Sequence, residues 1–210
     1  METNQPVDLL LYDSGRFPPA DHVLGRTEDC ARYIEYLEAQ RVLPLVGPPG
    51  CGLKSLAASI GEVCRQQGYT CFWFTFRDAY RDQVDDLLWD GSIFLTGQGA
   101  TAYQRFLQDD RRAAHPYPLS VKVTHFLREF RSGKVLVVLA NTQVVSHNPL
   151  FQAVLAEMKA HFRYGDNTSA RLMLVGNTLP LELEDHGLAD VGGLSLAASR
   201  ELLARMGVHL

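Results

Sequence analysis

A glycine-rich stretch directly after an apolar run constrains the fold of this chain most strongly. Residues 42–46 read Val-Leu-Pro-Leu-Val, and the stretch from Gly47 to Gly52 follows at once. Residues 55–60 then have helix-compatible spacing. A strand, a glycine loop and a helix in this order are typical of a phosphate-binding loop, whose usual pattern is G-x-x-x-x-G-K-[ST].

The chemistry of such a loop names its candidate binding residues. Glycines let the backbone curl so that its N–H groups face phosphate oxygens, and the helix N-terminus adds partial positive charge. The lysine neutralises the outer phosphates, and the Ser/Thr hydroxyl ligates Mg²⁺. We therefore predict nucleotide contacts from Gly47, Pro49, Gly50, Cys51, Gly52, Lys54, Ser55 and Leu56. If Mg²⁺ binds, Ser55 is its predicted ligand.

One residue departs from this pattern, because Leu53 stands between Gly52 and Lys54. If Leu53 is helical, Lys54 is turned by about 100° around the helix axis. If the loop bulges instead, Lys54 keeps its place and the anion cradle changes shape. A third interpretation is a Gly/Pro turn that joins a strand to a helix and holds no ligand.

The rest of the chain alternates apolar strands with amphipathic helices. This alternation predicts an α/β fold with a mainly parallel central sheet between two layers of helices. We expect strands at 42–46, 70–76, 134–139 and 172–175, with a short edge strand near 189–192. We expect helices at 27–40, after the loop to about 67, 82–89, 102–107, from 120, from 149 and from 195 to 207. Residues 109–118, with their mixed charges, read as an exposed loop.

Length and charge narrow the classes of function. The 210 residues fit an extended lead-in (1–22) and a single domain (23–210). The net charge is −4 and no long basic run is present, which argues against nucleic acid as a partner. The first residues lack the charged and apolar segments of a signal peptide, and no apolar run approaches the roughly 20 residues that span a bilayer. The four cysteines lack disulfide or zinc spacing, so we expect a cytoplasmic protein.

Several segments in the right order carry a family resemblance. Residues 24–28 are similar to the "GR-x-E" element, 47–55 to a Walker A loop, and 135–141 stand where a Walker B strand belongs. Residues 174–178 lie where a sensor strand ends, and 191–195 resemble the exit from the core domain. Together they resemble the nucleotide-binding domain of STAND signalling ATPases, the NB-ARC-like and NACHT-like relatives of AAA proteins.

The resemblance implies a three-layer P-loop NTPase core that binds ATP or ADP with Mg²⁺. It also implies that Arg26 lies near the nucleotide and that Asn177 and Thr178 are sensor-like residues. Partners would be other proteins or further copies of the chain. The family continues into helical and winged-helix lid modules, which this sequence of 210 residues does not contain.

The Walker B strand departs from the family pattern. Ala140 and Asn141 stand where an acid for Mg²⁺ and an acid that prepares water are expected. Neither carries a charge, and Asn141 cannot act as a base. Asp78, just after the second strand, is a conceivable substitute, although a surface or capping aspartate is the preferred interpretation. Hydrolysis is therefore not expected.

Two hypotheses on function follow. The first is a degenerate STAND-like domain, non-catalytic or weakly nucleotide-binding, which acts as a signalling or scaffold module. The alternative is a working switch ATPase with a bulged Walker A loop and an acid from Asp78 or a partner. A small-molecule kinase is a weaker third interpretation, because no acceptor site is visible and His125, His147 and His161 are scattered.

Overall fold

The computed structural model describes residues 25–77, 83–131, 133–166, 169–178 and 189–205. The predicted lead-in, Asp78 and the end of the last predicted helix lie outside these residues. The strands are β1 (Val42–Val46), β2 (Thr70–Thr75), β3 (Val135–Ala140), β4 (Arg171–Gly176) and β5 (Ala189–Asp190). The helices are α1 (Thr27–Gln40), α2 (Leu53–Gln66), α3 (Val84–Gly97), α4 (Ala102–Arg112), α5 (Leu119–Arg128), α6 (Pro149–Tyr164) and α7 (Leu196–Arg205).

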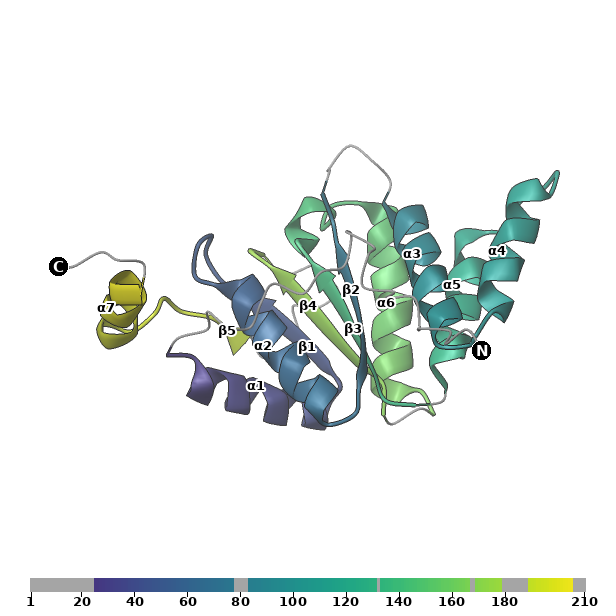
Figure 1. Cartoon of the computed structure of the whole chain (residues 1–210). Helices are drawn as coiled ribbons and strands as arrows, with labels where there is room; N and C mark the ends of the chain where they lie inside the picture. The colour runs from purple at the N-terminus through teal and green to yellow at the C-terminus, as the bar shows by residue number, and fades with distance from the viewer. Residues whose placement is uncertain (1–24, 78–82, 132, 167–168, 179–188, 206–210) are drawn as a thin grey trace, which may run out of the picture.

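The five described strands form one sheet, in the order β2-β3-β4-β1-β5. Every pair is parallel, as the alternation of elements in the sequence predicts. The carboxyl ends of β1, β3 and β4 therefore lie at one edge of the sheet (Figure 1). Ligands of open parallel sheets bind in the crevice at this edge.

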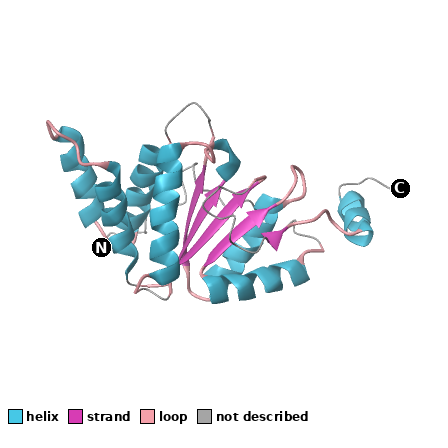
Figure 2. Ribbon diagram, turned by 180° about the vertical axis from the view of Figure 1, so that it is seen from behind, coloured by secondary structure: helices cyan, strands magenta, loops and turns pink. Residues whose placement is uncertain are grey.

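Alternate residues of each strand pack on opposite faces of the sheet, which gives the predicted three layers (Figure 2). On one face, Phe72, Val137 and Leu172 pack with apolar residues of the helices α3 to α6. On the other face, Trp73, Val138 and Met173 pack with apolar residues of α1 and α2. The strands read as continuous apolar runs because both faces are covered.

Two of the four predicted N-terminal caps are present in the structure. Asn148 caps α6 as expected, and its side chain accepts hydrogen bonds from the N–H groups of Leu150 and Phe151. Ser195 likewise accepts a hydrogen bond from the N–H of Ala198. Thr27 and Ser120 do not cap, since both already lie inside their helices.

The prediction of an exposed loop at 109–118 was wrong for its first four residues. Helix α4 continues through Arg112, and Asp110 is buried, with 2% of its surface exposed. Its carboxylate pairs with the Lys122 ammonium at 2.8 Å and accepts a hydrogen bond from the N–H of Tyr117. The charge pattern of this segment therefore reflects an internal ion pair between α4 and α5.

Helix α7 lies beyond β5, at the side of the molecule away from α3 to α6 (Figures 1 and 2). Ala198 is its buried residue. Gly25 has φ +65°, and a Cβ built on it would lie 2.2 Å from the Cβ of Ala198. A glycine is therefore needed where the chain enters α1. None of the described helices is both long and apolar enough to cross a bilayer.

Candidate functional site

A pocket of about 290 Å³ lies at the carboxyl edge of the sheet. Three segments line it: the glycine-rich loop with the first turn of α2, the turn after β3, and the end of β4. The lining residues are Pro48, Gly50, Gly52, Leu53, Lys54, Ser55, Asn141, Gln143, Val175, Gly176 and Asn177.

The start of α2 decides how the extra residue is accommodated. Gly52 adopts the left-handed conformation, and Leu53 is the first residue of an uninterrupted helix. The N–H of Leu56 donates to the carbonyl of Gly52 at 2.9 Å, as in a regular first turn. Of the helical and the bulged arrangement of Leu53, the structure has the helical one. Lys54 is therefore turned around the helix axis, away from the position that the pattern gives to lysine.

Because the loop has the usual length, the motif is better described by which residues follow its second glycine than by an inserted residue. Residues 47–52 supply the six residues of G-x-x-x-x-G between β1 and α2. Leu53 then occupies the position that the pattern gives to lysine, and Lys54 occupies that of the Ser/Thr hydroxyl. Ser55 lies one position further along the helix, although it still lines the pocket.

The residues at the two positions where the sequence pattern leads one to expect a lysine and a Walker B acid are apolar. Leu53 is 8% exposed and Ala140 is fully buried, and both belong to the cluster of apolar side chains between the sheet and α2. Cys51 and Val175 belong to the same cluster. A carboxylate at position 140 would have to be buried there, which costs free energy unless a cation compensates it.

Asn141 follows Ala140 with φ 60° and ψ 38°, in the left-handed region. Asparagine tolerates this conformation better than most residues. Its side-chain amide nitrogen donates to the carbonyl of Phe76 at 3.1 Å, which ties the turn after β3 to the end of β2. The structure thus gives Asn141 a role in the backbone turn, and its side chain still lines the pocket.

Gln143 is a pocket residue that the sequence analysis missed. Its side-chain oxygen accepts a hydrogen bond from the N–H of Asn177 at 3.3 Å, which joins the turn after β3 to the end of β4. Gly176 makes this approach possible, because a Cβ there would lie 2.4 Å from the hydroxyl oxygen of Thr142. Its place just past the predicted Walker B strand could have indicated that this polar residue lies at the site.

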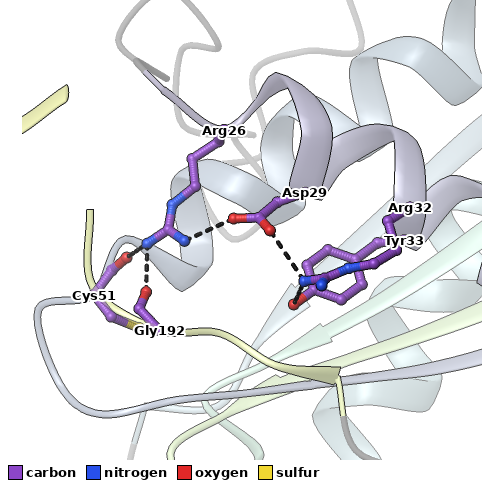
Figure 3. Close-up of polar contacts among 6 residues, drawn as sticks. All are labelled: Arg26, Asp29, Arg32, Tyr33, Cys51 and Gly192. Carbon is purple, nitrogen blue, oxygen red and sulfur yellow. Dashed lines mark hydrogen bonds and ion pairs between the residues drawn. The ribbon is translucent and has the colours of Figure 1, made fainter. Parts of the chain in front are cut away.

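Arg26 contacts the glycine-rich loop at Cys51 (Figure 3). It is 5% exposed, and its guanidinium donates to the carbonyl of Cys51 at 2.8 Å and to that of Gly192 at 2.6 Å. It also pairs with Asp29 at 2.8 Å. The residue therefore connects the loop, the segment after β5 and α1, and it is absent from the pocket lining.

The other predicted contacts divide between the pocket and the core. Leu56 is fully buried, its N–H donates to the carbonyl of Gly52, and it is not among the lining residues, so its contact with a nucleotide stays a prediction. Gly47 is fixed by close packing, because a Cβ there would lie 2.6 Å from the carbonyl oxygen of Val191. Pro49, Cys51 and Thr178 are not among the lining residues, whereas Asn177 is.

The magnesium ion that this fold implies does not fit the described residues. Mg²⁺ prefers oxygen ligands and is usually bound through one or two carboxylates together with phosphates. The described lining contains no carboxylate, and it contains the Lys54 ammonium. The charge of Lys54 would repel a divalent cation that bound close to it.

Comparisons with known proteins show the fold. The structure is similar to a Walker-type ATPase of Pyrococcus abyssi, with TM-score 0.59 and 14% identity over 93% of this chain and 62% of that one. It is also similar to a STAND protein with a tetratricopeptide repeat sensor from Pyrococcus horikoshii, with TM-score 0.61 and 12% identity over 92% and 26% of the two chains. AMPPCP-bound DnaA of Aquifex aeolicus gives TM-score 0.53 and 15% identity over 97% and 58%.

The fold is that of a P-loop ATPase domain. The chain spans less than two thirds of each of these three structures. No family model matches the sequence, and no curated protein matches it either. The similarity at these identities is one of fold, and shared chemistry does not follow from it.

Proposed function

We propose that this P-loop ATPase-like domain has kept the fold and the pocket but not hydrolysis. It acts as a non-catalytic signalling or scaffold module of the STAND type in the cytoplasm, through contacts with other proteins or with further copies of itself. It binds ATP or ADP weakly at the pocket, or holds no nucleotide.

One observation carries this proposal: Leu53 and Ala140 fill the lysine and Walker B acid positions and belong to the same apolar cluster. Phosphoryl transfer depends almost entirely on positioned charge and metal. At those two positions this chain has apolar side chains instead of charged ones. The two changes support each other, because a carboxylate beside Leu53 would have no cation at the lysine position to balance it.

The alternative, a working switch ATPase, requires Lys54 to return to the lysine position through a bulge in the loop. The regular first turn of α2 weighs against it. It also requires an acid from Asp78, which lies outside the described residues, or from a partner.

A hydrolysis assay with Mg²⁺ and ATP separates the two proposals. We expect phosphate release no faster than in a buffer blank, because neither the metal-holding acid nor the lysine is in place. Lys54→Ala is the companion variant, since contaminating ATPases are unaffected by it. Turnover that the wild-type protein shows and Lys54→Ala abolishes would overturn the proposal and support the switch ATPase.

A further inference from the structure

We propose that the Lys54 ammonium takes the place of Mg²⁺ in this pocket, so that the domain binds the polyphosphate of a nucleotide without a divalent metal. The inference rests on the proposed function for its ligand, a nucleotide at the P-loop pocket. It goes beyond it by stating which cation neutralises the phosphates and how binding responds to metal.

The position of Lys54 is the first step of the argument. In the P-loop pattern, the residue two places after the second conserved glycine is the Ser/Thr whose hydroxyl ligates Mg²⁺. Gly52 is that glycine here, and Lys54 is the second residue of α2. Its side chain is exposed and lines the pocket, and no anionic partner for it occurs among the described residues. The ammonium is therefore available to an anion in this pocket.

The loss of the acid is the second step. A Walker B carboxylate is useful when it holds a cation that comes from solution, whereas a covalently attached ammonium needs no such ligand. Ala140 is buried and carries no charge, so it holds no cation from solution, which is consistent with a cation supplied by Lys54.

The remaining lining groups suit phosphate oxygens rather than a metal. Ser55, Asn141 and Gln143 bring hydroxyl and amide groups to the pocket, and loop N–H groups at a helix N-terminus attract anions. In the usual site, a lysine and a magnesium ion, offset by one acid, supply two positive charges. Lys54 alone supplies one, so we expect weak binding that added Mg²⁺ does not improve.

The test is isothermal titration calorimetry of the full chain with ADP and with ATP, each in EDTA and in Mg²⁺. We expect binding in EDTA, and an equal or weaker affinity in Mg²⁺, because the metal withdraws the free nucleotide and is repelled by Lys54. Lys54→Gln removes one charge-assisted contact, so we expect affinity in EDTA to fall about tenfold. The control is Arg112→Gln, which removes an exposed cation at the end of α4 and should leave affinity unchanged.

A second variant keeps the chain length and restores the usual order of residue types. In Leu53→Lys/Lys54→Ser, with Ala140→Asp added, the pocket regains a lysine, a hydroxyl and an acid in the standard positions. We expect its nucleotide affinity to become higher in Mg²⁺ than in EDTA. Circular dichroism of each variant verifies that it is folded before titration.

Three results would overturn the inference: wild-type binding that requires Mg²⁺, binding in EDTA that Lys54→Gln leaves intact, or no binding in either condition. None of them touches the absence of hydrolysis, which the proposed function requires. Conversely, turnover in Mg²⁺ that Lys54→Ala abolishes would overturn both the proposed function and the role of Lys54, because hydrolysis would then use a metal in this pocket.

Discussion

Charged side chains at the amino and carboxyl edges of the sheet differ in how they are paired. At the amino edge, the buried Arg171 guanidinium at the start of β4 pairs with the Glu38 carboxylate of α1 at 2.8 Å. The hydroxyl of Tyr69 donates to the same carboxylate at 3.1 Å. Burial acts to raise the pKa of Glu38, but the hydrogen bond and charge of Arg171, with help from Tyr69 and Lys134, hold it below its usual value. Charges at this edge are matched within the protein.

At the carboxyl edge, one cation, Arg26, supports the fold, and another, Lys54, is exposed in the pocket. The Arg26 guanidinium pairs with Asp29 and donates hydrogen bonds to two backbone carbonyls. Lys54 lines the pocket without an anionic partner in the described part of the chain. The cations that support the fold are paired at both edges, whereas Lys54 is exposed in the pocket, where we propose that a phosphate balances its charge.

The largest effect is expected for the structural cation of the carboxyl edge. Arg26→Ala leaves the carbonyls of Cys51 and Gly192 without their charged donor, and we expect a loss of about 3 kcal/mol in the free energy of unfolding. Urea denaturation measures it. Arg32→Ala is the matched control: the Arg32 side chain is 64% exposed, so its ion pair with Asp29 should be worth less than about 1 kcal/mol. Equal losses in the two variants would mean that the contacts of Arg26 to the loop add nothing.

The matched pair of the amino edge is expected to give the next largest effect. Glu38→Gln leaves the buried Arg171 cation without its carboxylate, which costs 3–5 kcal/mol for a fully buried pair. The Glu38 side chain is 45% exposed, so we expect a smaller loss, of about 2 kcal/mol, in the same urea experiment. Glu35→Gln, an exposed substitution on the same helix, serves as the control and should stay within about 0.5 kcal/mol of wild type. A loss no larger than that control would show that water replaces Glu38 without cost.

The same carboxylate makes the amino edge sensitive to acid. The pKa of Glu38 is depressed in the folded state, so its contribution is complete above the unfolded pKa of about 4.3 and is lost as pH falls through that value to the folded one. We expect the difference in unfolding free energy between wild type and Glu38→Gln to shrink below about pH 4.3. Denaturation series at several pH values measure it, and a difference that persists at low pH would assign the effect to packing.

The smallest effect is expected for Lys54 in the absence of ligand. A cation in the first turn of a helix opposes the helix dipole, and alanine is the better helix former, so Lys54→Ala should raise the unfolding free energy by about 0.3–0.5 kcal/mol. Thermal unfolding in a phosphate-free buffer measures it. A destabilisation instead would mean that Lys54 supports the fold, which would break the contrast between the two edges.

Local sequence patterns determined the core of this protein. The apolar runs that became β1 to β4, and the loop that follows β1, could be placed because burial on both faces gives a strand no polar positions. The caps of α6 and α7 followed from side chains that accept hydrogen bonds from the first N–H groups of a helix. Local patterns failed where a long-range partner decided the outcome, as for Asp110, whose burial depends on Lys122 on another helix.

By itself, the sequence showed that Leu53 departs from the phosphate-loop pattern and that Ala140 stands where an acid is expected. It did not show where the helix begins or which way Lys54 points. Only the tertiary structure decided that α2 begins at Leu53, which places Lys54 in the hydroxyl position and draws Leu53 and Ala140 into one apolar cluster. The physical reason is that the start of a helix depends on what its first turn packs against. Here the sheet and α1 bury Leu53, Leu56 and Ala57, and this burial sets the direction in which Lys54 points.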